Sequence, residues 1–380
     1  MKNYMVGGYT TVGKSHADKG IKCQDSCYYD SNDNIVIAAI ADGLSSSKHS
    51  DVASQTVVKF VVNYCIKNIT EKDSEDEIIA ILKKSFDDTL FTIKQIARAE
   101  QNDINDYDTT LTVAVLIDDN LYYGQIGDSG IVALLEDGRF ERVTEAQNGE
   151  GIGKDRPVYP LAAISKWSFK KYEKKIKALF LATDGVLKNI QHPLLERQKY
   201  TINHRYLAYI YTTLFSLKDD KEVKEYIKNE VEKLTPEEVD YDDKTLVVVI
   251  NRKCSFKKQP DDYYNFPTDE LWKNIQKQYE TELYPYRNQE NDVNKNDLNI
   301  EEIKSSENYK EKIASKNNDD GTEETTKQIP LIQKKSENKT DIEANKKNDK
   351  SKLIKKENKI EIYILKVLLI ILCVLLVMLI

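Results

Sequence analysis

Cysteine is scarce in this chain, and the cysteines present follow no metal-binding or redox pattern. There are five among 380 residues, an odd number: Cys23, Cys27, Cys65, Cys254 and Cys373. Cys23 and Cys27 have no CxxC partner pair elsewhere, which favours buried thiols over a zinc site. The N-terminal segment also lacks an apolar stretch that could serve as a signal peptide. We therefore expect a protein of a reducing compartment.

A strong charge of one sign is absent as well. The net charge is only -7 and its carriers are spread along the chain, which argues against nucleic acid as the main partner. Aromatic residues are nearly absent from 288–360, where Tyr309 stands alone among Lys, Glu, Asn, Asp and Ser. Such a segment cannot bury enough apolar surface to offset its ordering entropy, so we expect a disordered charged linker there.

The C-terminal segment 361–380 is the one long apolar run. Ile362 to Ile380 carry a single charge, Lys366, and at 1.5 Å per residue they span about 28 Å, close to the hydrocarbon core of a bilayer. Lys366 lies near one end, where its ammonium can snorkel to the headgroups. Seven lysines against two acidic residues in 346–359 favour the cytoplasmic side. We expect a single-pass transmembrane anchor with a cytoplasmic body; a hydrophobic helix docked on a partner protein is the alternative.

The rest of the chain divides by composition. Residues 1–255 hold the periodic apolar positions of one globular domain, predicted to be monomeric. Residues 256–287 form an extension too rich in aromatic residues for a plain linker. This extension is predicted either to pack on the domain or to bind a partner.

Within the domain, strand and helix patterns alternate. Asn34 to Ala41 is almost wholly apolar and β-branched, as in a strand buried on both faces. Asp51 to Ile69 and Glu75 to Ala99 carry apolar stripes at helical spacing and are predicted to be two neighbouring helices. The other predicted strands are 109–117, 121–128, 131–135, 140–143, 178–183 and 244–250, and the other predicted helices are 194–217 and 221–234. Short turns between consecutive strands require antiparallel pairing, so we expect an α+β antiparallel sandwich with helices outside.

Four aspartates stand at the ends of apolar runs. Asp42, Asp128 and Asp184 each end such a run and are followed by a small residue, while Asp242 precedes the run Leu246 to Ile250. This pattern predicts that the carboxylates meet at one edge of a sheet. At about 5 Å separation and an effective dielectric of 20, each pair would repel by about 3 kcal/mol. Either the groups are protonated or they bind hard cations, and an all-oxygen set favours Mg or Mn.

The order of these motifs resembles the metal-dependent protein phosphatases, the type 2C serine/threonine family, over roughly residues 5–252. The motifs that carry the resemblance are His16 to Asp25 (HADKGIKCQD), Ala41-Asp42-Gly43, Asp108-Thr109-Thr110, Gly127-Asp128-Ser129, Ala182-Thr183-Asp184-Gly185 and Asp242-Asp243-Lys244-Thr245. The resemblance implies a four-layer α/β/β/α sandwich with two central antiparallel sheets. It also implies protein substrates phosphorylated on serine or threonine, with a serine/threonine kinase as a candidate partner in signalling.

The resemblance further implies roles for individual residues. Asp42 would bridge two metal ions and Asp184 and Asp242 would be protein ligands of the first. The Gly43 carbonyl would serve the second, and Gln24 and Asp25 would hold metal-bound waters. Asp128, together with Asp184, would mark a third, weaker metal position. The two ions would activate a bridging water that attacks phosphorus in line, without a covalent intermediate.

This chain departs from the family at two positions. Leu44 stands where many members have a histidine that protonates the leaving group, and Gly20 stands where many have an arginine that binds the phosphate. Cationic side chains nearby in sequence are Lys14, His16, Lys22, Lys48 and His49. We expect His16 to take one of the two tasks, the alternative being a structural or solvent-facing histidine. The sequence thus predicts a membrane-tethered phosphatase; the alternative is a catalytically weak module that binds a phosphoprotein or kinase at the membrane.

Overall fold

A computed structural model describes residues 3–147, 158–191, 202–234 and 242–283. These residues all belong to one compact unit, Met1–Lys295. Within the described residues no helix has the length and apolar character needed to cross a membrane. The predicted linker (288–360) and the predicted anchor (361–380) lie outside the described residues, as does the first third of the predicted helix 194–217.

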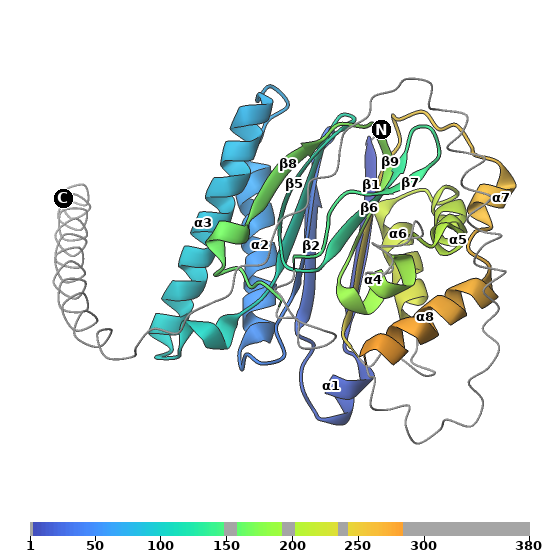
Figure 1. Cartoon of the computed structure of the whole chain (residues 1–380). Coiled ribbons are helices and arrows are strands. Elements are labelled where there is room, and N and C mark those ends of the chain that lie inside the picture. The colour runs from blue at the N-terminus through green and yellow to red at the C-terminus, as the bar shows by residue number, and fades with distance from the viewer. Residues whose placement is uncertain (1–2, 148–157, 192–201, 235–241, 284–380) are drawn as a thin grey trace, which may run out of the picture. The chain divides into compact units, whose positions relative to one another are not determined.

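Two antiparallel five-stranded sheets form the centre of the unit (Figure 1). Sheet I has, in spatial order, β2 (Asp25–Ser31), β3 (Ile35–Asp42), β4 (Leu111–Ile117), β5 (Asn120–Ile126) and β8 (Ser168–Tyr172). Sheet II has β1 (Tyr4–Thr11), β10 (Lys244–Asn251), β9 (Ile176–Ala182), β6 (Gly130–Leu135) and β7 (Phe140–Arg142). Every strand pair is antiparallel, as the short turns require.

Helices cover the outer faces of both sheets (Figure 1). Sheet I carries α2 (Ser50–Asn68) and α3 (Glu75–Ala99). Sheet II carries α4 (Asp184–Ile190), α5 (His204–Leu214) and α6 (Asp220–Lys233). The shorter elements are α1 (Lys14–Asp18), α7 (Asp261–Tyr264), α8 (Asp269–Leu283) and the 3-10 turns Ile104–Tyr107 and Ile164–Lys166. The predicted four-layer α/β/β/α sandwich is therefore confirmed.

Alternation along β3 explains how one strand serves two layers. Ile35, Ile37 and Ala39 pack against α2 and α3, whereas Val36 and Ala38 point into the space between the sheets. Because successive side chains of a strand point to opposite faces, a strand buried on both sides reads as a continuous apolar run. The run Asn34 to Ala41 was predicted on this ground.

Several elements escaped sequence prediction. Three strands, β1, β2 and β8, and the short helices α1 and α4 were not anticipated. β2 reads DSCYYDS and β8 reads SFKKY, so neither has the apolar run that identifies a buried strand. β1 contains Gly7 and Gly8, which sequence patterns associate with turns rather than strands. These strands form because their neighbours supply hydrogen-bonding edges.

The aromatic-rich extension packs on sheet II. The Phe140 amide donates a 2.7 Å hydrogen bond to the Tyr263 hydroxyl, and the Tyr264 hydroxyl donates one of 2.7 Å to the Gly138 carbonyl. The Tyr263 ring stacks on His204 with centroids 4.2 Å apart. Trp272 of α8 is buried. Of the two predicted possibilities, these contacts correspond to packing on the domain.

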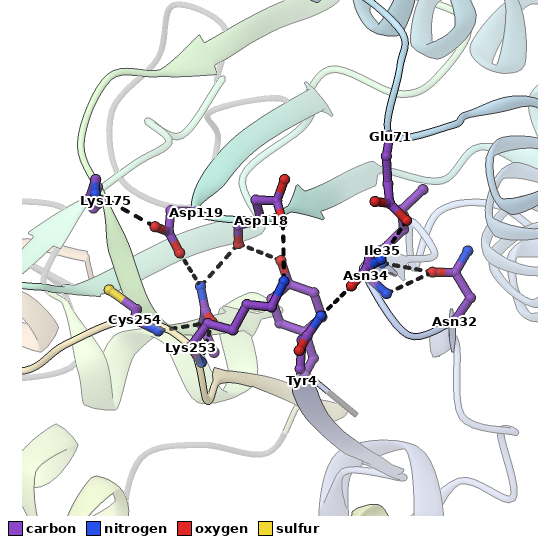
Figure 2. A network of polar contacts seen from close by, with 12 residues as sticks. Tyr4, Asn32, Asn34, Ile35, Glu71, Asp118, Asp119, Lys175, Lys253 and Cys254 are labelled. Carbon is purple, nitrogen blue, oxygen red and sulfur yellow. Dashed lines mark hydrogen bonds and ion pairs between the residues drawn. The ribbon is translucent and has the colours of Figure 1, made fainter. Parts of the chain in front are cut away.

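A polar network joins the two sheets at the end opposite α1 (Figure 2). The Tyr4 hydroxyl donates to the Asp118 carbonyl in the turn between β4 and β5. Asn251, at the end of β10, donates from Nδ2 to the same carbonyl at 3.0 Å and to Asp119 Oδ1 at 3.0 Å. Lys175 and Lys253 add ion pairs to Asp119 and Asp118. These hydrogen bonds and ion pairs hold the two sheets together at this end of the sandwich.

Candidate metal centre

The predicted carboxylates gather at the ends of strands from both sheets. In sheet I, Asp42 is the last residue of β3 and its register partner Asp25 is the first of β2. In sheet II, Asp184 is the second residue after the end of β9, and Asp242 precedes β10. Asp128 lies in the connection from β5 of sheet I to β6 of sheet II. The prediction of one sheet edge is therefore corrected: two sheets meet here, because the sandwich stacks their ends.

Asp25 is fixed by two threonine hydroxyls of the opposite sheet. Its Oδ2 accepts hydrogen bonds from Thr183 Oγ1 at 2.6 Å and from Thr245 Oγ1 at 2.9 Å. Thr183 Oγ1 in turn accepts the Thr245 amide at 3.1 Å. The side chain of Asp25 is buried, and these hydroxyls satisfy one of its oxygens without neutralising its charge.

Backbone contacts hold the end of β3 in place. The Asp42 carbonyl accepts from the Thr110 amide at 2.8 Å and from Thr109 Oγ1 at 3.0 Å. The Gly43 amide donates to the Gln24 carbonyl at 3.0 Å. An added Cβ on Gly43 would lie 2.7 Å from Ser50 Cβ and 2.8 Å from the Gln24 carbonyl oxygen. Only glycine fits at this position, which explains the Asp-Gly pair physically.

The carboxylates repel one another electrostatically. Burial raises the pKa of Asp42 well above its usual range, and the charges of Asp25, Asp184, Asp128 and Asp242 raise it further. Burial, with Asp184 and then Asp242 as neighbours, raises the pKa of Asp128 to about 7. The pKa values of Asp25 and Asp184 are raised as well, again mainly by burial. Burial and mutual repulsion thus act together against ionisation of these carboxylates.

Asp243 ties the segment before β2 to the start of β10. Its Oδ1 accepts from the Gly13 amide at 2.6 Å and its Oδ2 accepts from the Gln24 amide at 2.6 Å. His16 of α1 is buried, and its Nδ1 lies 3.0 Å from Asp243 Oδ2 without hydrogen-bond alignment. The segment that carries His16 and Gln24 is thereby anchored beside Asp242.

The residues present fit a hard divalent cation in their chemistry. Asp128 Oδ1 and Gln24 Oε1 are buried oxygens without a hydrogen-bond partner, as expected of atoms that can face a cation. The set is all oxygen, which suits Mg or Mn. Among the described residues, however, no three His, Cys, Asp or Glu side chains are close enough together to hold a metal ion as they stand. Electrostatic interaction extends over longer distances than metal coordination, so the two observations are compatible.

The two positions that depart from the family lie in different settings. Gly20 is exposed, with φ +66 and no heavy atom within 4 Å of an added Cβ. Leu44 directly follows the Asp42-Gly43 pair, and its amide donates to the Asp108 carbonyl at 3.1 Å. No charged side chain is supplied by either residue.

Four site residues escaped sequence reasoning: Thr183, Thr245, Asp243 and Lys188. The first three lie within the quoted motifs but were given no role, because their partners are on other strands. Lys188 is the fifth residue of α4, one turn after Asp184. Its charge lowers the pKa values of Asp184 and Asp128, against the dominant effect of burial. The helical spacing i, i+4 was the signal that could have identified it.

Comparisons with known proteins bear on this geometry. A family model, Protein phosphatase 2C, matches residues 12–232. None of the curated proteins matches the chain in sequence.

Among solved structures, the chain is similar to a bacterial serine phosphatase at 14% identity and a TM-score of 0.46, covering 65% of this chain and 97% of that one. It is similar to the S. agalactiae serine/threonine phosphatase at 17% identity and a TM-score of 0.44, covering 65% and 99%. It is also similar to the catalytic domain of the serine/threonine protein phosphatase PstP, solved in complex with 2 manganese ions, at 18% identity and a TM-score of 0.43, covering 65% and 97%.

Proposed function

The chain belongs to the protein phosphatase 2C family, whose model matches residues 12–232 of 380, and we propose that it hydrolyses phosphoserine and phosphothreonine in proteins with the help of divalent cations. The proposal combines family membership with the site at the strand ends. Phosphorylated proteins are the substrate class.

The observation that carries the proposal is the position of Asp42. It is the register partner of Asp25 across the β2–β3 pair, and burial, followed by the charges of Asp25, Asp184, Asp128 and Asp242, raises the pKa of its carboxylate. Repulsion of this kind is a considerable fraction of the stability of an ordinary domain. A binding module with no need for cations would gain stability by losing these charges, whereas a cation-dependent enzyme requires them.

The residues that would hold the cations follow from the donor set. Asp42, Asp184 and Asp242, with the Gly43 carbonyl, are the proposed direct ligands of two Mg or Mn ions. Gln24 and Asp25 are the proposed contacts through water. When bound, the two cations supply a hydroxide nucleophile from water and offset charge on the phosphoryl oxygens.

The chain's own residues prepare this site by holding it in position. Thr183 and Thr245 fix one oxygen of Asp25. Thr109 and the Thr110 amide fix the carbonyl of Asp42. Groups held in this way need little rearrangement when substrate arrives, which lowers the entropic part of the barrier.

His16 is proposed to act by positioning rather than by touching substrate. Its burial and the 3.0 Å separation of Nδ1 from Asp243 Oδ2 favour this role over the predicted catalytic one. A His16→Asn enzyme should need more Mn²⁺ for half-maximal activity while the pH dependence of kcat keeps its shape. Loss of the alkaline limb of that pH profile would instead identify His16 as the proton donor.

Membrane tethering is part of the proposal and is supported by the sequence alone. The apolar run Ile362 to Ile380 follows the lysine-rich stretch 346–359, so the catalytic unit would face the cytoplasm. Fractionation of cells expressing the full chain and a chain lacking 361–380 tests this part. Equal recovery of both chains in the soluble fraction would contradict it.

The central experiment measures phosphate release from a phosphothreonine peptide by the full chain, with Mn²⁺ and with chelator. We expect release with Mn²⁺ only, and a loss of at least about a hundredfold in Asp42→Asn. Asp87→Asn, on the exposed face of α3, is the matched control and should retain full activity.

The same experiment separates the proposal from a catalytically weak module that binds a phosphoprotein or kinase. Leu44 and Gly20 favour that alternative, since neither supplies the usual proton donor or phosphate ligand. Mn²⁺ binding without phosphate release would support the module. Release that persists in chelator would contradict both.

A further inference from the structure

The carboxylates of the centre divide into two pairs by their electrostatic surroundings. The inner pair is Asp25 and Asp42, and the outer pair is Asp128 and Asp184. Among the leading influences on the pKa values of these four groups, one cation appears, Lys188, and it acts on both members of the outer pair. The leading influences on the inner pair include no cation.

The fold explains why Lys188 lies beside the outer pair. Asp184 is the first residue of α4 and Lys188 the fifth, so their side chains lie one turn apart on the same helix face, with Cβ atoms about 6 Å apart. Leu187 packs against Gly130, since an added Cβ on Gly130 would lie 2.8 Å from Leu187 Cδ2. Gly130 is two residues after Asp128. The first turn of α4 and the Asp128 connection are therefore in contact.

Burial gives this ammonium more influence than a surface lysine would have. Lys188 is half-buried, and screening by solvent weakens as charges leave the surface. Asp128 Oδ1 is buried without a hydrogen-bond partner, so this oxygen is not satisfied by a nearby N–H or O–H. The positive charge of Lys188 partly offsets the charge of the outer pair, against the larger effect of burial.

We propose that Lys188 takes the place of a third divalent cation beside Asp128 and Asp184, so that the centre binds two divalent ions and not three. This inference rests on the proposed function and narrows it. Lys188 supplies one positive charge that acts on both Asp128 and Asp184, the two carboxylates that a third divalent ion would otherwise offset. A third divalent ion at the outer pair would meet the repulsion of Lys188.

The test is the number of Mn²⁺ ions bound per full chain, measured by equilibrium dialysis with metal analysis. Wild type and Lys188→Arg, which keeps the charge, should bind about two ions. Lys188→Asp removes the cation and adds a ligand oxygen, so it should gain one further, weaker ion. Lys94→Asp, on the exposed face of α3, makes the same charge change far from the centre and should bind as wild type does.

Each outcome decides a different question. Three ions in wild type, or an unchanged number in a Lys188→Asp protein whose circular dichroism is native, would overturn the inference and leave the phosphatase proposal standing. An unchanged number together with a raised KM for the phosphopeptide would assign Lys188 to substrate instead, which also overturns it. Absence of any bound Mn²⁺ in wild type would overturn the proposed function itself.

Discussion

The Thr183 hydroxyl donates a 2.6 Å hydrogen bond to Asp25 Oδ2, and this bond joins sheet II to sheet I at the centre of the carboxylate site. Thr183 directly precedes Asp184, and Asp25 is the register partner of Asp42. Together with the Thr245 hydroxyl, which donates to the same oxygen, this contact links carboxylates of different sheets. The two sheets must be packed correctly before the site exists at all.

Replacement of Thr183 by valine keeps its shape and removes this donor. The Thr183 hydrogen bond lowers the pKa of Asp25, against the larger effect of burial, so its loss should make the carboxylate harder to ionise. We expect a loss of about 1 to 2 kcal/mol in the free energy of unfolding and a higher Mn²⁺ concentration for half-maximal activity. Urea unfolding and Mn²⁺ titration of activity measure the two effects.

Thr56→Val is the control for that substitution. The Thr56 hydroxyl is exposed and donates to the Val52 carbonyl at 2.7 Å within α2. Thr56→Val should change neither the free energy of unfolding nor the Mn²⁺ concentration for half-maximal activity measurably. If Thr183→Val also left the Mn²⁺ requirement unchanged, the bond to Asp25 would have no part in preparing the site.

The stability of the metal-free protein should fall as pH rises. Burial raises the pKa of Asp128 to about 7, while in an unfolded chain an aspartate titrates near 3.9. Between these values the folded protein binds more protons than the unfolded chain, so the free energy of unfolding decreases with increasing pH. Asp25, Asp42 and Asp184 shift in the same direction and add to the effect.

Thermal unfolding in chelator should therefore give a higher Tm at pH 5.5 than at pH 8. Added Mn²⁺ should raise Tm most at pH 8, where the carboxylates are charged. Asp128→Asn should flatten the pH dependence in chelator. A Tm in chelator that rises from pH 5.5 to pH 8 would show that the carboxylates do not dominate.

A side chain at Gly43 should damage the site. The Cβ of Gly43→Ala would lie 2.7 Å from Ser50 Cβ and from the Ser50 carbonyl oxygen, so the chain beside Asp42 must move. We expect a loss of about 1 to 3 kcal/mol in stability, as in other overpacked sites, together with loss of Mn²⁺-dependent activity. Urea unfolding and the phosphopeptide assay measure both.

Gly20→Ala provides the contrast. Nothing lies within 4 Å of an added Cβ there, but φ is +66, so the cost is backbone strain alone, about 1 kcal/mol. Activity at a temperature where the protein stays folded should be retained. Equal losses of activity in the two variants would contradict a special role for the space at Gly43.

The end of the sandwich opposite the carboxylates should affect stability without affecting catalysis (Figure 2). Asn251 is fully buried; its Oδ1 accepts the amides of Lys253 at 3.0 Å and Cys254 at 3.2 Å, and its Nδ2 donates toward Asp118 and Asp119. Asn251→Ala leaves several buried polar groups unpaired and should cost about 3 kcal/mol.

Urea unfolding should show this loss, whereas kcat/KM at a permissive temperature should match wild type. Asn68→Ala is the control. The side-chain amide of Asn68 donates to the Tyr64 carbonyl at the surface, so its removal should lower the free energy of unfolding much less. A drop in kcat/KM for Asn251→Ala under conditions where it is folded would mean that the two ends of the sandwich are coupled.

Local patterns in the sequence were sufficient to predict the elements whose environment is uniform along their length. β3 is apolar at every buried position, and α2 and α3 carry continuous apolar stripes, so each was predicted to within one or two residues. β2 and β8 are mixed in polarity because they are less fully buried than β3. β2 pairs with the next strand in the chain, β3, whereas β8 pairs with β5, which is distant from it in sequence.

The sequence by itself determined which aspartates end the buried strands, because a charged side chain after an apolar run marks the point where the chain leaves the core. Only the tertiary structure decided how those carboxylates are held and balanced. It directed Asp243 toward Gln24 and His16, joined Thr183 and Thr245 to Asp25, and set Lys188 beside the outer pair. Contacts of this kind depend on how two sheets and a helix pack together, and packing between distant segments leaves no periodic pattern in the chain.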